Sequence, residues 1–136
     1  MSGKKLSAMK NSKLSISILN ENFAVCRLNA DENIPDWIIK DSFFSITKTA
    51  EELSIVCLEK GVPGYVKSEK EWRAIKIEGE LDFSQTGILA SLAAPLAEAK
   101  ISIFAASTFN TDYILVKSNK LEKAIEILSK FFNIIS

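Results

Sequence analysis

The segment from Leu81 to Val116, LDFSQTGILASLAAPLAEAKISIFAASTFNTDYILV, contains the clearest local patterns in the chain. Its first half predicts an amphipathic helix over residues 85–99, because apolar residues recur there at spacings of one, three and four: Ile88, Leu89, Leu92 and Leu96. Asp82 or Ser84 is expected to cap the first turn. Pro95 lies inside the pattern and predicts a kink or an early end, since its ring disrupts a helix interior.

After this helix the apolar period changes from helical to alternating. Alternation predicts a strand at Ile101–Ala106 and a second strand at Tyr113–Lys117. The polar corner Ser107–Asp112 between them reads as a hairpin loop. Upstream, Trp72–Glu78 also alternates and predicts a half-buried strand.

A final helix follows, with Asn119 as the expected N-cap and Glu122 three residues later. Its apolar stripe comprises Leu121, Ala124, Ile125, Leu128 and Phe132. Strand, helix, strand, strand, helix is the order of a βαββαβ unit, which builds an antiparallel sheet with two helices on one face. Only Asn133–Ser136 remains for the closing strand, so we expect the two halves of the chain to complete each other.

The first half of the chain has strand signals in the same order but weak helices. Strands are predicted at Leu14–Leu19, Phe23–Leu28, Phe43–Thr49 and Leu53–Glu59. Residues 49–52 read as a hairpin turn, and Ile34–Ile39 predicts a turn or two of helix with Pro35 near its start. The predicted fold class is therefore α+β: two ferredoxin-like (βαββαβ) units packed side by side, residues 13–68 and 69–136, the first with vestigial helices. Units of about 60 residues are marginal alone, which favours coupling.

Composition excludes several classes of function. Seventeen basic residues balance seventeen acidic ones, so no net field attracts nucleic acid or an acidic membrane. The N-terminal lysines, Lys4, Lys5, Lys10 and Lys13, read as a solvated tail rather than a basic arm. No apolar run reaches the roughly 18 residues that spanning a bilayer requires. We expect a soluble, cytoplasmic protein.

Catalysis has little support in the sequence. The chain has no histidine, no glycine-rich phosphate loop, and two cysteines, Cys26 and Cys57, without CxxC spacing. We therefore expect no enzyme activity, no metal site and no cofactor, and two buried thiols. Trp37 and Trp72 lie among apolar residues and are interpreted as core or interface anchors rather than ligand platforms.

Binding is better supported, because the polar corner Ser107–Asp112 is expected beside a helix N-terminus at Gly87. Helix N-termini offer unpaired N–H groups and partial positive charge to a carboxylate. Asp112 could accept hydrogen bonds from an ammonium or guanidinium group, or its carboxylate could cap its own turn. Gly87 could admit a ligand or only relieve crowding, and Phe109 could be a ligand wall or a core residue.

These residues resemble a known family. The second half looks like an ACT domain, a small ligand-binding module of amino-acid metabolism. With FFSITKTAEELSIVC in the first half and STFNTDYILV in the second, the chain resembles the tandem-ACT proteins of bacteria and the related CASTOR arginine sensors of animals. The resemblance implies a ligand site at Gly87, Ile88, Thr108, Phe109, Thr111 and Asp112. The sensors have four ACT units and an aromatic residue where this chain has Thr111.

The resemblance implies a non-catalytic regulatory sensor whose ligand is an amino acid or similar small zwitterion. Because this chain has two units and not four, we expect a homodimer or higher homo-oligomer. The alternative is a protein–protein interaction or oligomerisation module without a metabolite ligand. Neither reading involves nucleic acid or a membrane.

Overall fold

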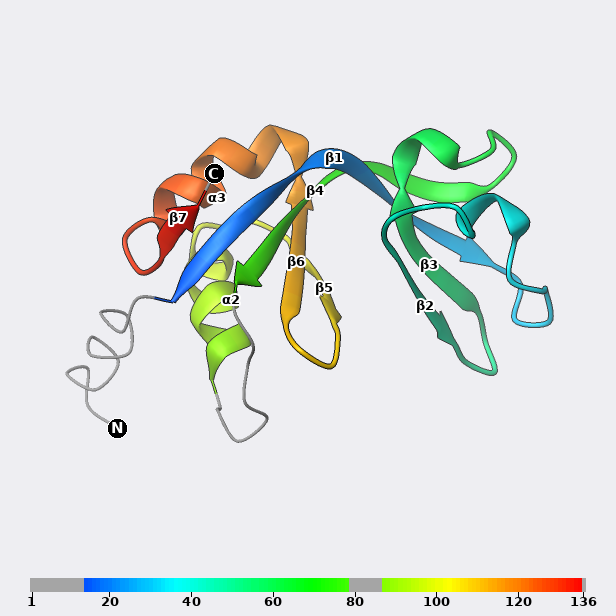
Figure 1. Ribbon diagram of the computed structural model, residues 1–136, viewed down its shortest axis with the longest axis horizontal. Coiled ribbons are helices and arrows are strands. Elements are labelled where there is room, and N and C mark those ends of the chain that lie inside the picture. Colours follow the sequence, from blue (N-terminus) through cyan, green and yellow to red (C-terminus); the bar gives the residue numbers. More distant parts are fainter. Residues whose placement is uncertain (1–13, 79–86, 136) are drawn as a thin grey trace. The chain divides into compact units, whose positions relative to one another are not determined.

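The structure, a computed structural model, describes residues 14–78 and 87–135 (Figure 1). The lysines near the N-terminus, Asp82, Ser84 and Ser136 lie outside the described residues. The elements are β1 (Ser15–Leu28), η1 (Asp36–Ile38), β2 (Phe44–Lys48), β3 (Leu53–Leu58), η2 (Glu59–Gly61), β4 (Lys67–Glu78), α2 (Ile88–Glu98), β5 (Phe104–Ser107), β6 (Asp112–Lys117), η3 (Ser118–Lys120), α3 (Leu121–Leu128) and β7 (Asn133–Ile135).

The chain divides into two compact units. The central unit comprises residues 20–73, and the terminal unit comprises the described residues before 20 and after 73. Strands β1 and β4 contribute residues to both units. The boundary between residues 68 and 69 that the sequence suggested stays a prediction.

The terminal unit is an α+β unit with a core on one face of its sheet. Alternate residues of β4 and β6 enter this core, as the sequence predicted for β4. Helices α2 and α3 both contribute to the same core through Ile88, Leu92, Leu96, Ala124 and Leu128, so both lie on that face. The closing strand β7 does form, and it pairs in parallel with the first residues of β1, Ser15–Ser17. A segment from the start of the chain therefore completes this unit.

Helix α2 ends where the spacing predicts, since Glu98 is its last residue and Ala99 its C-cap, whereas the predicted start at residue 85 lies outside the described residues. It begins at Ile88, and it continues through Pro95 to Glu98, so the proline does not end it. A left-handed residue ends it instead: Lys100 has φ +62°, and the Ile101 N–H bonds back to the Leu96 carbonyl at 2.9 Å. The alternating pattern predicts that the next strand begins at Ile101. Because this turn holds Ile101, β5 begins at Phe104 instead.

The predicted N-cap of the last helix is wrong. Asn119 lies within η3, where its backbone is already helical, and Lys120 occupies the N-cap position without a side-chain capping bond. The predicted stripe is confirmed at Ala124, Leu128 and Phe132, which are buried, and at Leu121, which packs against the core. It is wrong at Ile125, because Ile127 packs against the core in its place.

The central unit is built on antiparallel strands. β1 pairs with β3 from Phe23↔Leu58 to Leu28↔Leu53, and β3 pairs with β2. The two strands predicted between residues 14 and 28 are one continuous strand. The hairpin turn between β2 and β3 is confirmed, because the Thr49 N–H bonds to the Glu52 carbonyl at 2.9 Å. The helix predicted near Pro35 is a single 3-10 turn, η1.

Candidate functional site

The N-terminus of α2 is shaped by Gly87. This residue has φ +83°, a left-handed conformation that favours glycine, and no atom of the described residues lies within 4 Å of where a Cβ would stand. Conformation rather than crowding therefore selects glycine here. The Gly87 carbonyl accepts bonds from the Ser91 N–H at 2.8 Å and the Ser91 hydroxyl at 2.7 Å. The next residue, Ile88, is 5% exposed and belongs to the core, so only its backbone can face a ligand.

The loop between β5 and β6 is closed by two threonines. The Thr108 N–H donates to the Thr111 carbonyl at 2.8 Å, and the Thr108 hydroxyl accepts from the Thr111 N–H at 3.2 Å. The Thr111 side chain is buried, and its hydroxyl donates to the Ile77 carbonyl of β4 at 2.6 Å. Both hydroxyls that the resemblance implied for ligand contact are thus engaged in holding the loop.

Asp112 is the first residue of β6, where it pairs with Ser107 and is half-buried. Thr108 makes the bonds that close the turn, so the structure does not require the Asp112 carboxylate as a cap. Within the described residues this carboxylate makes no hydrogen bond or ion pair and remains a candidate anion for a ligand. Phe109, at the tip of the loop, is 79% exposed and is not a core residue.

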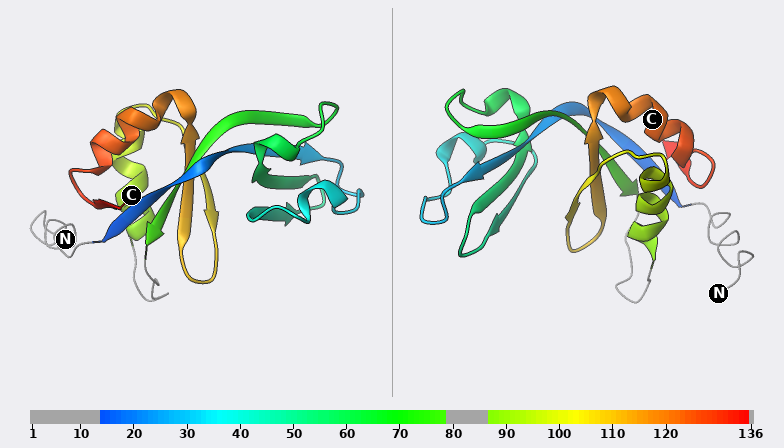
Figure 2. Two further views of the ribbon diagram at one scale, coloured as in Figure 1. Left: turned by 45° about the horizontal axis from the view of Figure 1, so that its top comes forward. Right: turned by 180° about the vertical axis from the view of Figure 1, so that it is seen from behind.

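The start of α2 and the β5–β6 loop lie at the same end of the terminal unit in every view (Figures 1 and 2). That end combines two kinds of recognition group. The helix supplies no acceptor to the N–H groups of its own first turn, which favour an anion. The Asp112 carboxylate favours a cation. Such a pair suits a zwitterion; the convergence of the predicted site residues on one ligand remains a prediction.

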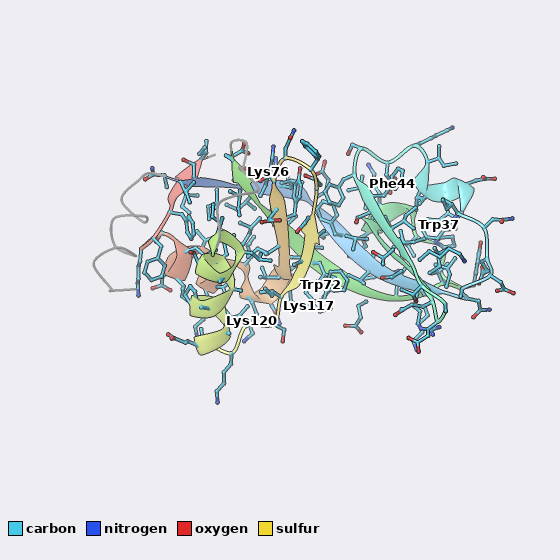
Figure 3. All side chains as sticks on the ribbon, turned by 90° about the horizontal axis from the view of Figure 1, so that it is seen from below. Trp37, Phe44, Trp72, Lys76, Lys117 and Lys120 are labelled. Atoms are coloured by element: carbon cyan, nitrogen blue, oxygen red, sulfur yellow. The ribbon has the colours of Figure 1, made fainter. Side chains whose placement is uncertain are left out.

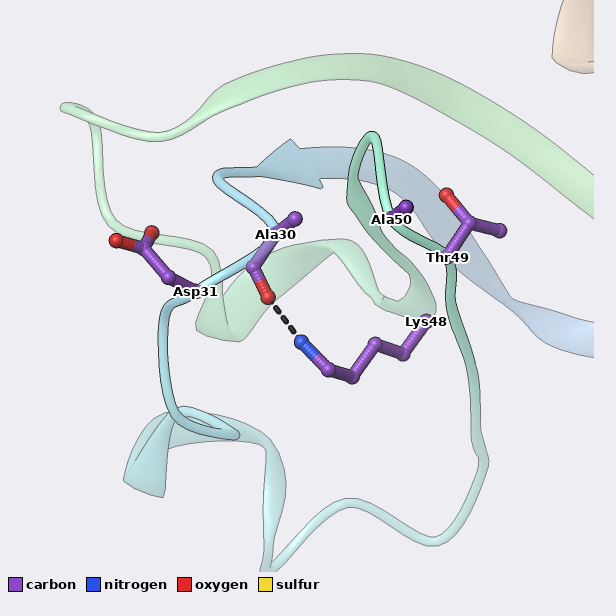
Figure 4. A pocket seen from close by; sticks show the side chains of 5 residues that line it. All are labelled: Ala30, Asp31, Lys48, Thr49 and Ala50. Atoms are coloured by element: carbon purple, nitrogen blue, oxygen red, sulfur yellow. Dashed lines mark hydrogen bonds between the residues drawn. The ribbon is translucent and has the colours of Figure 1, made fainter.

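The central unit carries surface clefts that the sequence did not reveal. The wider cleft, of about 890 Å³, is bordered by residues 27–29, 31–37 and 65–67, including the exposed Tyr65. A smaller one, of about 510 Å³, lies where Lys48 donates to the Ala30 carbonyl beside Asp31, Thr49 and Ala50 (Figure 4). Only the polar run around Asp31 hinted at an irregular loop there. In the smaller cleft the Lys48 ammonium already donates a hydrogen bond to a backbone carbonyl.

The remaining candidate residues have structural roles. Trp72 is 8% exposed and Trp37 packs against the central core (Figure 3), which agrees with the interpretation of both as anchors. Cys26 and Cys57 are both buried free thiols. In residues 14–78 and 87–135, no group of three or more Cys, Asp or Glu side chains is placed to hold a metal ion.

Comparison with known proteins identifies the family. A family model described as the ACT domain matches residues 67–130, and a second model, described as an N-terminal domain, matches residues 21–65. The crystal structure of protein Atu0741 from Agobacterium tumefaciens is 40% identical with a TM-score of 0.85, covering 90% of this chain and 92% of that one. The chain belongs to the ACT-domain family. The ferredoxin-like fold of the terminal unit is the ACT fold.

This ACT-domain protein is related to animal arginine sensors. The human cytosolic arginine sensor for mTORC1 subunit 1 is 43% identical over 60 residues, which is 43% of this chain and 18% of the sensor. The human protein CASTOR3P is 36% identical over 106 residues, 68% of this chain and 65% of that protein. This ACT-domain protein thus spans less than a fifth of the sensor's length. Neither helix in the described part of the chain has the length and apolar character needed to cross a bilayer.

Proposed function

We propose that this ACT-domain protein is a non-catalytic regulatory sensor that binds an amino acid or similar small zwitterion at the α2 end of its terminal unit. The observation that carries this proposal is the state of Asp112. Its neighbours Thr108 and Thr111 are engaged in holding the loop, and its carboxylate makes no hydrogen bond or ion pair within the described residues. A half-buried carboxylate that has no such bond within the described residues is suited to bind the ammonium or guanidinium group of a ligand.

The proposed roles of the site residues follow from their contacts. The backbone N–H groups at Gly87 and Ile88 bind the ligand carboxylate, helped by the helix dipole. Asp112 binds the cationic group. Thr108 and Thr111 fix the loop that presents Asp112, and Phe109 supplies an apolar surface for the rest of the ligand. The name of the related human protein, a cytosolic arginine sensor, supports an amino-acid ligand and a cytoplasmic location.

We also propose that both halves of the chain are ACT units and that the protein works as a homodimer or higher homo-oligomer. The exposed apolar side chains of β7, Ile134 and Ile135, support assembly from more than one copy. The central unit has the paired strands β1, β2 and β3, with the 3-10 turns η1 and η2 in place of helices. In this view η1 and η2 are vestigial counterparts of α2 and α3.

A thermal-shift screen with the common amino acids tests the binding function. A ligand present at 100 times its dissociation constant stabilises the fold by about 2.7 kcal/mol, which is readily measured. We expect a shift with at least one amino acid and its loss in Asp112→Asn, which keeps the side-chain shape and removes the charge. Asp36→Asn is the matched control, because Asp36 is an exposed carboxylate of the central unit. An unchanged shift in Asp112→Asn rules out the proposed ionic contact.

The second candidate is an interaction module without a metabolite ligand. Exposed apolar side chains in the central unit favour it: Ile34, Ile39 and Tyr65. The same screen separates the two functions. Absence of a shift with every amino acid at millimolar concentration, together with self-association that Tyr65→Ser abolishes, would support the interaction module instead.

A further inference from the structure

The two cysteines of the central unit lie in direct contact. Cys26 on β1 faces Ile55, and Cys57 on β3 faces Ala24, so the two thiols occupy diagonal positions on one face of the paired strands. Their sulfurs are 4.0 Å apart and hydrogen-bonded, and both residues are at most 1% exposed. Residues 31 positions apart in sequence are thus held as a dithiol by the strand register.

The contact shifts the pKa values of the two thiols in opposite directions. The hydrogen bond from Cys57 lowers the pKa of Cys26; burial opposes this effect, and nearby Lys70 adds a smaller lowering effect. The same bond, together with burial, raises the pKa of Cys57 far above its ordinary value. Thiolate is the reactive form of cysteine, and either sulfur can donate the shared hydrogen bond; because Lys70 also favours the Cys26 thiolate, Cys26 is the expected nucleophile and Cys57 the thiol that follows.

We propose that Cys26 and Cys57 are an oxidation site at which hydrogen peroxide forms a reversible disulfide between β1 and β3. Burial excludes bulky oxidants, whereas peroxide is not much larger than water. The Cys26 thiolate attacks one peroxide oxygen, the O–O bond breaks, and hydroxide leaves and takes up the proton that Cys26 released. The Cys57 sulfur then attacks the sulfur of the resulting sulfenic acid, and water leaves with the Cys57 proton. One peroxide and two thiols give one disulfide and two waters.

Closing the bond requires the sulfurs to approach by about 2 Å, since a disulfide is about 2.0 Å long. Each sulfur is carried by one rotatable Cα–Cβ bond, so side-chain rotation supplies part of this approach, and the paired strands β1 and β3 must supply the rest. The new bond closes the chain segment from 26 to 57, which includes most of the border of the wider cleft. Oxidation therefore stabilises the central unit and restricts the loop that borders the cleft.

The experiment exposes the intact chain to hydrogen peroxide and follows thiol titration, intact mass and peptide mapping. We expect both thiols to disappear together, with a loss of two hydrogens, a linked Cys26–Cys57 peptide, and full reversal by dithiothreitol. The unfolding equilibrium constant of the oxidised chain should fall on the order of 100-fold. Sulfinic acid without a linked peptide, a link between chains, or thiols untouched by a dose that oxidises the urea-unfolded chain would overturn the proposal.

Two variants separate the roles of the thiols. In Cys57→Ala we expect Cys26 to be oxidised more slowly than in the unsubstituted chain, because the hydrogen bond that lowers its pKa is lost. The sulfenic acid that does form there should be trapped by dimedone, because no resolving thiol remains. In Cys26→Ala we expect Cys57 to be oxidised more slowly than the pair in the unsubstituted chain, because its partner is gone and burial still raises its pKa; an equal rate would show that the contact between the thiols does not matter. The peptide map of the unsubstituted chain decides the proposal even where a variant does not fold.

Discussion

The Thr111 hydroxyl is predicted to stabilise the terminal unit rather than to select a ligand. Thr111→Val keeps the shape of the side chain and removes the 2.6 Å bond to the Ile77 carbonyl. The residue is 6% exposed, so water cannot readily replace that bond. Loss of one partner of a buried hydrogen bond costs about 1–3 kcal/mol. With a urea m-value of about 2 kcal/mol/M, the unfolding midpoint should fall by about 0.5–1.5 M.

The assay is urea unfolding followed by circular dichroism, which reports helices α2 and α3 of the terminal unit. Both tryptophans, Trp37 and Trp72, lie within residues 20–73, so tryptophan fluorescence reports the central unit separately. Thr108→Val is the matched control, because Thr108 is exposed and water can take over its bonds. We expect its cost to stay below about 0.5 kcal/mol. Equal destabilisation by the two variants, or none by Thr111→Val, would refute this account of the loop.

Two further changes test how the terminal unit is held together. Lys100→Gly should raise the free energy of unfolding by about 1 kcal/mol, because a backbone φ of +62° is strained in any residue that has a Cβ. A lower thermal unfolding midpoint in this variant would show instead that the lysine side chain contributes more to stability than the relief of backbone strain. Leu92→Ala should lower the free energy of unfolding by about 2–5 kcal/mol, because the Leu92 side chain is fully buried in the core of the terminal unit. A loss of less than about 1 kcal/mol in a urea titration would contradict this packing.

Local periodicity predicted most of the terminal unit, and the departures have identifiable causes. The stripe of α2 and the alternation of β4 follow from side-chain spacing, which any core must satisfy. The end of α2 was predicted, but the left-handed conformation of Lys100 was not, because lysine occupies a position where glycine is usual. The single strand β1 was read as two because Asn20, Glu21 and Asn22 look like a turn, whereas they are exposed residues within a continuous strand.

Non-local pairing was beyond prediction from spacing. Nothing in the sequence near Asn133 specifies that β7 pairs with Ser15–Ser17, more than a hundred residues away, although the need for a strand from elsewhere was apparent. The contact between Cys26 and Cys57 has the same character, because it depends on the register of β1 against β3. Sequence showed both thiols as apolar-strand residues and could not show that they touch.

The candidate site illustrates why residue types alone do not assign roles in a polar loop. Thr108, Thr111 and Asp112 can each close a turn or bind a ligand, and a turn needs only some of them. Once Thr108 closes the loop and Thr111 bonds to β4, no structural task in the described residues requires the Asp112 carboxylate. In the proposed function, the ligand is then recognised through two groups, the backbone amides at the start of α2 and the Asp112 carboxylate. No side-chain hydroxyl contributes. Such a site binds the zwitterionic backbone common to amino acids, so discrimination among them must come from the apolar surface around Phe109.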